Sequence, residues 1–270
     1  MLVDRHAVHK AAESEVLIAS VEPEADGRWL TRLVVARSHW LCRPWPASVP
    51  VTLLAEAFRQ AGMAVCVLGL DVPPDSHFVI SAMTVEWDAD ALAFPRFGAY
   101  EAPLHVSITD TELRKGMLHR LHVDYSIDGV ASGHVTAQML NDRDYRVVRR
   151  GAAQMSGGEV TLVDDIIVDP VITETGMVAA LGVQWTDPFF FDHPVDHLPG
   201  MLLLHAAATL HQRFGPAVPS RLDITFLRFA ELGRETRIDQ RSTDGVMVTT
   251  FLQEDQPVAE AVIAAARVPA

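Results

Sequence analysis

The sequence has only two cysteines, Cys42 and Cys66, in 270 residues. Two thiols supply neither a disulfide framework nor a cysteine-based metal cluster, and such usage is typical of a reducing compartment. No uninterrupted apolar run reaches the roughly 18 residues that a membrane-spanning helix needs. The N-terminal stretch MLVDRHAVHKAAESE also lacks the apolar block of a secretory signal. We therefore expect a cytoplasmic protein that does not enter a membrane.

Positive charge is also scarce, because 22 Lys and Arg residues face 35 Asp and Glu residues, for a net charge of −13. Since phosphate backbones attract the opposite sign, this balance argues against a nucleic-acid-binding protein. One local basic run, DRDYRVVRRG, departs from it. The run is either a solvated loop between two halves or a docking patch for an acidic partner, such as a phosphopantetheine-bearing carrier protein. Its basic residues are Arg143, Arg146, Arg149 and Arg150.

Hydrophobic residues are plentiful, at 49%, and two apolar segments resemble each other. VPVTLLAEAFRQAG (49–62) and LPGMLLLHAAATLH (198–211) each have a proline, then apolar residues, then a polar residue six positions after the proline. The polar residues are Glu56 and His205. Because proline is tolerated where a helix begins, both segments predict mostly buried helices that start at the proline.

A second internal similarity follows each helix. HVDYSIDGVASGHVTAQM (122–139) and VTTFLQEDQPVAEAVIAAA (248–266) both alternate as strand, turn and strand, with turns at Asp128-Gly129 and Asp255-Gln256-Pro257. A helix that is apolar nearly all round must be buried on most sides, and a curved antiparallel sheet wrapped around it meets that need.

This pattern predicts an α+β double hotdog, with two pseudo-symmetric halves that each wrap a curved antiparallel sheet around a central helix. We expect an N-terminal half over 1–150, a Gly-rich linker over 151–158 and a C-terminal half over 159–270. A two-domain α+β protein without the repeat is the alternative.

The first predicted helix carries three polar residues, Glu56, Arg59 and Gln60, spaced i, i+3 and i+4, so they share one face. This face either meets a substrate, or Glu56 and Arg59 form a buried ion pair with each other, which is weak evidence for stability. His205 on the second helix is either a satisfied core residue or part of a second site.

The second helix follows an unusual loop, FDHPVDHLPG. His193 in this loop is a candidate catalytic residue, because the free N-terminus of the helix that follows offers backbone N–H groups to an oxyanion. Alternatively, the loop's aspartates and histidines only brace it. His193 and His197 are four residues apart, but a proline breaks any helix that would align them, so we predict no metal site.

Sequence resemblance extends these observations. TDPFFFDHPVDHLPGMLLLHAA (186–207) resembles the signature of hotdog 3-hydroxyacyl-carrier-protein dehydratases, with a shorter loop and His205 in place of the helix acid. The whole chain is more similar to the A-factor biosynthesis (AfsA-type) hotdog family. The matching segments occur in the family's order over nearly 3–267, and they are VHKAAESEVLIAS, RSHW, LLAEAFRQAG, DHPVDHLPGMLLLHAA and FLRFAEL.

The resemblance implies an acyltransferase that moves a β-ketoacyl group from acyl carrier protein to a hydroxyl of dihydroxyacetone phosphate or a similar small acceptor, in the biosynthesis of γ-butyrolactone-type signals. It implies no cofactor, since phosphopantetheine arrives with the carrier protein. The family usually has a Glu and an Arg on both central helices. This chain departs from that pattern, because its second helix has His205 and Ala208 there.

In hotdog dimers the helix acid of one unit works with the loop histidine of the other. The resemblance therefore implies that Glu56 and His193 are the catalytic residues of one site. The opposite site would combine His205 with Arg37 and His39, and we expect it to be degenerate because it lacks the acid and the arginine.

The expected substrate contacts complete this hypothesis. Backbone N–H groups of Gly200 and Met201 would bind the thioester carbonyl. Arg59 would bind an anionic acceptor, assisted by Gln60, since guanidinium suits phosphate geometry. Arg228 in FLRFAEL is a second candidate, unless it pairs with Glu231. The acyl tail would lie along a cleft lined by Leu53, Leu54, Phe58, Leu203 and Leu204.

Two other functions fit the same residues. A Glu and a His facing one thioester also suit a dehydratase, hydratase or thioesterase acting on carrier-protein or coenzyme A thioesters. A non-catalytic acyl-binding module is the third interpretation, because one fold hosts many chemistries. The acyl length, the acceptor and the oligomeric state are left open by the sequence.

Overall fold

The computed structural model describes residues 1–270 except 44–46, 115, 153–162, 216–217 and 266–270. The described chain divides into two compact units, Met1–Val148 and Arg149–Ala270. Most of the predicted linker, residues 153–158, lies outside the described residues.

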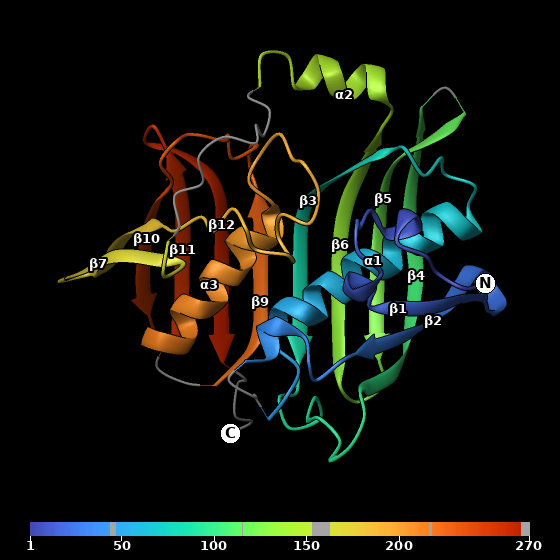
Figure 1. Cartoon of the computed structure of the whole chain (residues 1–270), viewed down its shortest axis with the longest axis horizontal. Helices are drawn as coiled ribbons and strands as arrows, with labels where there is room; N and C mark the ends of the chain where they lie inside the picture. The colour runs from blue at the N-terminus through green and yellow to red at the C-terminus, as the bar shows by residue number, and fades with distance from the viewer. Residues whose placement is uncertain (44–46, 115, 153–162, 216–217, 266–270) are drawn as a thin grey trace. The chain divides into compact units, whose positions relative to one another are not determined.

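The first unit places one long helix, α1 (Val51–Gly69), against an antiparallel sheet (Figure 1). Neighbouring strands in this sheet follow the order β1-β2-β4-β5-β6-β3, and all their pairings are antiparallel. The strands are β1 (Ile18–Pro23), β2 (Arg28–Val35), β3 (His77–Trp87), β4 (Tyr100–Arg114), β5 (Met117–Ile127) and β6 (Ala131–Leu140). Short 3-10 turns (His6–Val8, Glu13–Glu15, Ala25–Gly27, Trp40–Cys42) and helix α2 (Asp142–Val148) complete this unit.

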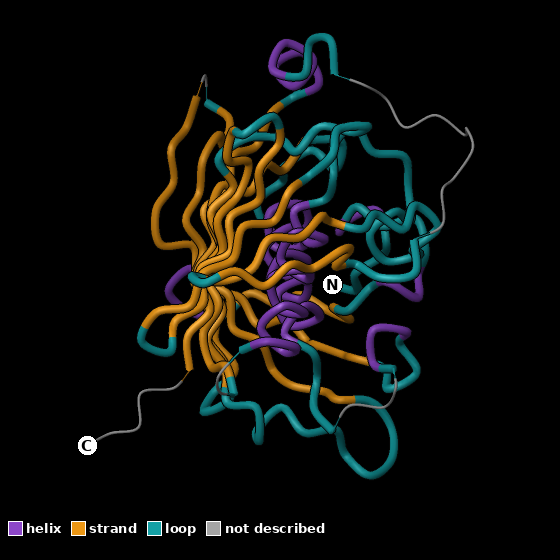
Figure 2. Tube along the Cα trace, turned by 90° about the vertical axis from the view of Figure 1, so that its left-hand side faces the viewer, coloured by secondary structure: helices purple, strands orange, loops and turns teal. Residues whose placement is uncertain are grey.

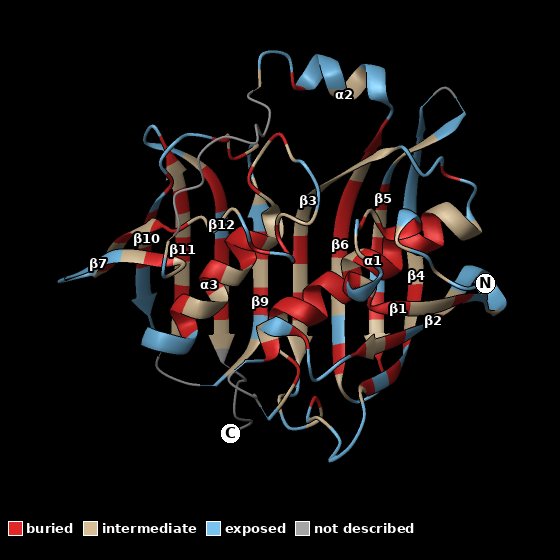
Figure 3. Ribbon diagram, viewed as in Figure 1, coloured by how far each residue is buried: buried red, intermediate tan, exposed pale blue. Residues whose placement is uncertain are grey.

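Helix α1 is the core of the first unit. Figure 3 shows it buried along most of its length. Its 19 residues have a mean hydropathy of 1.4 over an 18-residue window, so by length and composition it could cross a membrane, although polar residues interrupt it. Because 78% of that window is buried inside the fold, α1 is a core helix here.

The second unit repeats this plan with helix α3 (Gly200–Phe214) and the strand order β9-β12-β11-β10-β8-β7. Figure 2 shows long helices, drawn purple, packed beside the orange strands. The strands are β7 (Ile167–Thr173), β8 (Gly176–Leu181), β9 (Pro219–Phe226), β10 (Arg237–Thr243), β11 (Val246–Gln253) and β12 (Gln256–Ala265). The predicted pattern of one central helix and several antiparallel strands in each half is confirmed.

Both helices begin where the sequence predicted. Pro50 and Pro199 are extended N-cap residues, so α1 starts at Val51 and α3 at Gly200. A proline lacks the backbone N–H that would be unpaired at a helix start. Proline therefore marks the start of each helix, although it stands one position earlier than the first helical residue.

Both predicted hairpins exist, but the position of one turn is wrong. Strands β5 and β6 are joined through Asp128, Gly129 and Val130, where Gly129 has a φ of 68°. The β11–β12 turn is Glu254-Asp255, with φ of 49° and 59°, so the primed hairpin turn lies before the predicted Gln256-Pro257. Pro257 lies inside β12 beside a register shift, where a missing N–H is tolerated.

Candidate active site

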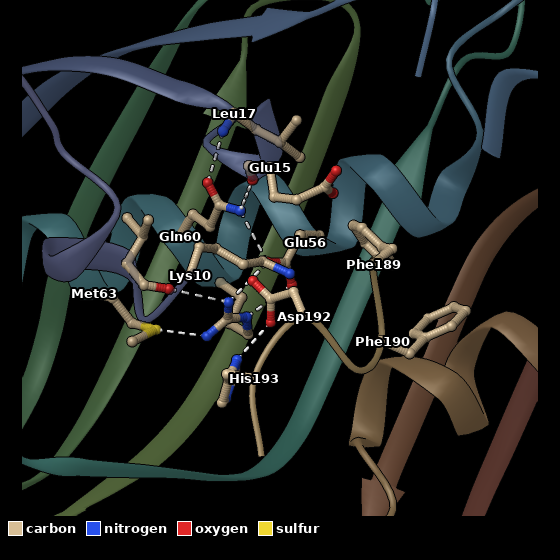
Figure 4. A network of polar contacts seen from close by, with 12 residues as sticks. Lys10, Glu15, Leu17, Glu56, Gln60, Met63, Phe189, Phe190, Asp192 and His193 are labelled. Atoms are coloured by element: carbon tan, nitrogen blue, oxygen red, sulfur yellow. Dashed lines mark hydrogen bonds and ion pairs between the residues drawn. The ribbon is translucent and has the colours of Figure 1, made fainter. Parts of the chain in front are cut away.

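Glu56 on α1 is the centre of a buried polar network in the first unit (Figure 4). Its side chain is 1% exposed. Arg59 donates from Nε to Oε2 and from Nη2 to Oε1, both at 2.7 Å. Gln60 Nε2 donates to Oε1 at 2.9 Å, and Lys10 Nζ lies 3.5 Å from the same oxygen. The three helix residues thus share one face, as their spacing predicted, and the ion pair between Glu56 and Arg59 is formed.

The electrostatics of this network keep Glu56 ionised. Burial raises the pKa of its carboxyl, but the charges of Arg59 and Lys10, with hydrogen bonds from Arg59 and Gln60, lower the pKa to about 2. A carboxylate of such low basicity, with hydrogen bonds to both oxygens, is poorly suited to take a proton from a hydroxyl group. The arrangement suits it to hold the two cationic side chains in position.

Gln60 connects α1 to the segment before β1. Leu17 N donates to Gln60 Oε1 at 2.7 Å, and Gln60 Nε2 donates to the backbone oxygen of Glu15 at 2.8 Å, besides its bond to Glu56. Because these contacts occupy both ends of a fully buried amide, Gln60 orients Glu56. This differs from the substrate-binding role expected from the sequence.

The two residues predicted to support a second site lie in different environments. His39 is buried, accepts from Leu41 N at Nδ1 and lies 3.1 Å from Glu15 Oε2 through Nε2. Because Nδ1 is the acceptor, Nε2 carries the hydrogen and donates this hydrogen bond to Glu15 Oε2. Arg37 is exposed and donates to backbone oxygens of residues 95 and 96. These contacts make His39 an interior residue and Arg37 a surface residue.

In the second unit, His193 presents an accessible imidazole beside a buried carboxylate. Its side chain is 46% exposed, whereas that of Asp192 is 4% exposed, and His193 Nδ1 is hydrogen-bonded to Asp192 Oδ1 (Figure 4). When Nδ1 carries the proton, Asp192 fixes that tautomer and Nε2 presents its lone pair. This carboxylate–histidine pair is the arrangement of a general base. The turn before it is capped by Asp187 Oδ1, which accepts from the N–H groups of Phe189 and Phe190.

A buried arginine fixes the next part of the same loop. Arg149 is 8% exposed; its Nε donates to Asp196 Oδ2 at 3.0 Å and its Nη2 to the backbone oxygen of Asp196 at 2.6 Å. Nη1 and Nη2 also donate to the two Glu231 oxygens at 2.7 and 2.9 Å. The guanidinium lies 4.4 Å above the Phe229 ring. Asp196 in turn holds His197 Nδ1 at 2.6 Å, so His197 is a bracing residue. We call Arg149, Asp196 and Glu231 the arginine clamp.

The arginine clamp corrects two predictions. Arg149 belongs to the basic run that we interpreted as a solvated loop or a docking patch, but its side chain is buried against carboxylates. Arg143, Arg146 and Arg150 are exposed, and their docking role stays a prediction. Because Glu231 pairs with Arg149, the alternative that Arg228 pairs with Glu231 is wrong: exposed Arg228 donates to Gln256 Oε1 at 2.9 Å.

The start and centre of α3 differ in polarity. Gly200 and Met201 form its first turn and are partly buried, and the first N–H groups of a helix have no partner within it. They can therefore serve as donors. Further along, the His205 ring lies 5.4 Å from the Phe190 ring. Burial, with the Arg213 charge, lowers the pKa of His205 to about 4, so it is neutral at pH 7.

The five residues predicted to line an acyl cleft are all buried. Their relative exposure is at most 2%, and they belong to the cores of their units: Leu53, Leu54, Phe58, Leu203 and Leu204. Their contact with an acyl tail stays a prediction. Over the part of the chain that the structure describes, no three His, Cys, Asp or Glu side chains are arranged to hold a metal ion.

The sequence did not predict that Lys10 belongs to the buried network around Glu56. It lies within VHKAAESEVLIAS, a segment used only for the family resemblance, and it is 46 positions from its partner Glu56. Because polar residues surround Lys10 in the sequence, nothing there indicated that its side chain is buried. In the structure this side chain is only 5% exposed. The resemblance of this segment to the family was the available signal.

Comparisons with known proteins show which family this chain belongs to. The model of the A-factor biosynthesis hotdog domain matches residues 1–141 and 161–269. A 2-oxo-3-(phosphooxy)propyl 3-oxoalkanoate synthase from Streptomyces virginiae is 26% identical over 257 residues, covering 86% of this chain and 84% of the relative. A protein of the same name from Streptomyces coelicolor is 27% identical over 250 residues, covering 83% and 77%.

The fold is also similar to that of an acyl-ACP thioesterase from Bacteroides thetaiotaomicron, with a TM-score of 0.56. The match covers 90% of this chain and 99% of that structure at 12% identity, so it concerns the fold alone. Together with the family match, it confirms the predicted α+β double hotdog. The chain belongs to the A-factor biosynthesis hotdog family.

Proposed function

We propose that this chain is an acyltransferase that moves a 3-oxoacyl group from acyl carrier protein to a hydroxyl of dihydroxyacetone phosphate. The observation that carries the proposal is the match to two relatives, which extends over most of their length. Both relatives are named as synthases of the same product. That product, a 2-oxo-3-(phosphooxy)propyl 3-oxoalkanoate, is the ester of a 3-oxoacyl group with dihydroxyacetone phosphate. It is a precursor of γ-butyrolactone-type signals in the family.

The second unit supplies the proton transfer. His193 Nε2 takes the proton of the acceptor hydroxyl as its oxygen attacks the thioester carbonyl, and the buried Asp192 carboxylate stabilises the imidazolium. The new C–O bond forms and the C–S bond breaks. His193 then returns the proton to the departing phosphopantetheine thiolate. No oxidant or reductant is needed, and N–H groups of Gly200 and Met201 are donors for the carbonyl oxygen.

The first unit supplies the charges for an anionic acceptor. Arg59 and Lys10 gather around Glu56, and a guanidinium is well suited to a phosphate group. Glu56 fixes the orientation of Arg59 through two hydrogen bonds. We therefore assign Glu56 a positioning role rather than that of the base. The family resemblance implies that Glu56 and His193 serve the same reaction.

Product analysis tests this function directly. Purified protein is incubated with 3-oxoacyl and 3-hydroxyacyl thioesters of acyl carrier protein and of coenzyme A, with and without dihydroxyacetone phosphate. Mass spectrometry is expected to find the phosphorylated ester only when the 3-oxoacyl carrier-protein thioester and the acceptor are both present, and the His193→Ala variant is the negative control.

Each other outcome overturns the proposal in favour of a stated alternative. Free acid formed regardless of acceptor identifies a thioesterase. Interconversion of the 3-hydroxyacyl thioester with its enoyl form identifies a dehydratase or hydratase. Binding of acyl thioesters without any turnover identifies a non-catalytic acyl-binding module.

A further inference from the structure

The RSHW segment contains a buried histidine that the proposed reaction does not use. His39 is 8% exposed, and its Nε2 donates to Glu15 Oε2 at 3.1 Å. Its Nδ1 accepts from Leu41 N at 3.2 Å, which fixes this tautomer. Glu15 is also 8% exposed, and the contact joins the 3-10 turn that ends at Glu15 to the one that begins after His39. We call Glu15 and His39 the turn pair.

The backbone of the same glutamate is bound to helix α1. Gln60 Nε2 donates to the backbone oxygen of Glu15 at 2.8 Å, and Leu17 N donates to Gln60 Oε1 at 2.7 Å (Figure 4). Gln60 Nε2 also donates to Glu56 Oε1 at 2.9 Å. An unbroken series of buried groups therefore connects His39 with Glu56.

The segment that contains Glu15 also supplies groups to the charged cluster. Lys10 Nζ lies 3.5 Å from Glu56 Oε1. The backbone oxygen of Val8 accepts from Arg59 Nη2 at 3.2 Å. Lys10 is thus carried by the N-terminal segment, whereas Arg59 is carried by α1. The position of this segment on the helix therefore sets the distance between the two cations.

We propose that the turn pair is a positioning device for the anion-binding site of Arg59 and Lys10. The inference rests on the proposed function, in which these two cations bind the phosphate group of the acceptor. Recognition of such a group needs donors held within about 0.5 Å of the productive geometry. His39 contacts Glu15 and Leu41 rather than the cations, so its loss should weaken acceptor binding and leave the chemical step nearly unchanged.

Two replacements of His39 separate its two hydrogen bonds. Glutamine places an amide N–H near the position of Nε2, so His39→Gln keeps a donor for Glu15. Asparagine places its carbonyl oxygen near the position of Nδ1, so His39→Asn keeps only the acceptor for Leu41 N. We expect His39→Asn to raise KM for dihydroxyacetone phosphate about tenfold, with kcat and KM for the acyl thioester within about twofold. His39→Gln should restore a KM close to that of wild type.

Thr31→Val is the matched control. Thr31 is fully buried in the same unit, and its Oγ1 donates to the Leu104 backbone oxygen at 2.9 Å, outside the series of groups that reaches Glu56. This variant should lower the melting temperature, as His39→Asn does, without raising KM for the acceptor. An equal rise in KM in both variants, or an unchanged KM in folded His39→Asn, overturns the inference. If His39→Asn does not fold, Glu15→Gln tests the same contact and should raise this KM about threefold.

A binding measurement separates this inference from the proposed function. Calorimetry gives the dissociation constant of dihydroxyacetone phosphate without turnover, in the presence and absence of a non-transferable 2-oxoalkyl thioether of pantetheine. If the protein forms no ester but His39→Asn still weakens this binding about tenfold, the function is wrong and the positioning role stands. If ester forms but neither KM nor the dissociation constant responds to His39→Asn, the function stands and the positioning role is wrong. Wild-type protein that binds no dihydroxyacetone phosphate in either condition contradicts both.

Discussion

The contacts of Glu56 suit this residue to position Arg59 rather than to act as a base. Its carboxylate is 1% exposed and receives hydrogen bonds on both oxygens. A buried charge of this kind is tolerated only when oppositely charged groups surround it. Removing it therefore affects both the stability of the fold and the orientation of Arg59.

The stability effect has a defined pH dependence. The folded-state pKa of Glu56, about 2, lies below its ordinary value of 4.5. A depressed pKa contributes stability that is fully present above the unfolded value and is lost as pH falls from about 4.5 toward 2. Glu56→Gln leaves two cations buried, so we expect it to cost about 3 kcal/mol at pH 7. Urea unfolding at several pH values measures the difference.

The difference between wild type and Glu56→Gln should shrink steadily below pH 4.5. Glu101→Gln, at an exposed ion pair with Arg32, is the control and should change stability by less than about 1 kcal/mol. A Glu56→Gln difference that is independent of pH contradicts the ion-pair assignment.

Asp192 gives a second test at the scale of one residue. Asp192→Asn keeps the shape of the side chain but removes the charge that stabilises a protonated His193. We expect kcat to fall by about 10² or more with a small change in KM, measured by ester formation under saturating substrates. His197→Asn, at the bracing histidine, is the control, and an equal loss in both variants would show that loop order alone matters.

At the scale of elements, the sequence predicted those features that depend on residues close together in the chain. Prolines fixed the starts of α1 and α3, and alternation revealed the β5–β6 and β11–β12 hairpins. One hairpin turn was misplaced because Glu254 adopts a positive φ, which is uncommon for glutamate. The stripe of Glu56, Arg59 and Gln60 followed from helical spacing.

Long-range pairing could not be read from the same patterns. Arg149 lies 47 residues from Asp196 and 82 from Glu231, and its arginine neighbours in the run are exposed. Nothing in the run DRDYRVVRRG distinguishes the buried arginine from them. Lys10 was missed for the same reason, because its partner is on another element.

The arginine clamp joins the start of the second unit to its candidate catalytic loop. Arg149→Ala leaves Asp196 and Glu231 partly buried without their counter-charge, so we expect it to cost about 3–5 kcal/mol. Arg149→Lys should not restore stability, since an ammonium cannot make the bidentate contacts. Chemical denaturation measures both.

If the clamp orients the loop, kcat should fall in the folded Arg149→Lys variant while KM for the acyl thioester changes little. Arg150→Ala, one residue along and exposed, is the matched control and should resemble wild type. A lysine variant with full activity and full stability would contradict a positioning role for the clamp.

At the scale of the whole molecule, the two units share a plan but not their chemistry. Each has one central helix against an antiparallel sheet, and each helix has a polar residue six positions after its proline. In the first unit that residue is ionised Glu56 with Arg59 and Lys10. In the second unit it is His205, which is neutral at pH 7, and the residue three positions further along is the uncharged Ala208. The two units therefore share a fold, whereas the cluster of Glu56, Arg59 and Lys10 belongs to the first unit.

This asymmetry predicts one competent site per chain. Calorimetry with a non-transferable 2-oxoalkyl pantetheine thioether should give a stoichiometry near one. His205→Gln should leave kcat/KM within about twofold, because the side chain carries no charge at pH 7 and its variant keeps a hydrogen-bonding amide. Glu56→Gln, assayed where circular dichroism shows it folded, should lose most activity, because Arg59 loses its orientation. A stoichiometry of two, or an inactive yet folded His205→Gln, would mean that the second unit has a working site built from groups other than a carboxylate and an arginine.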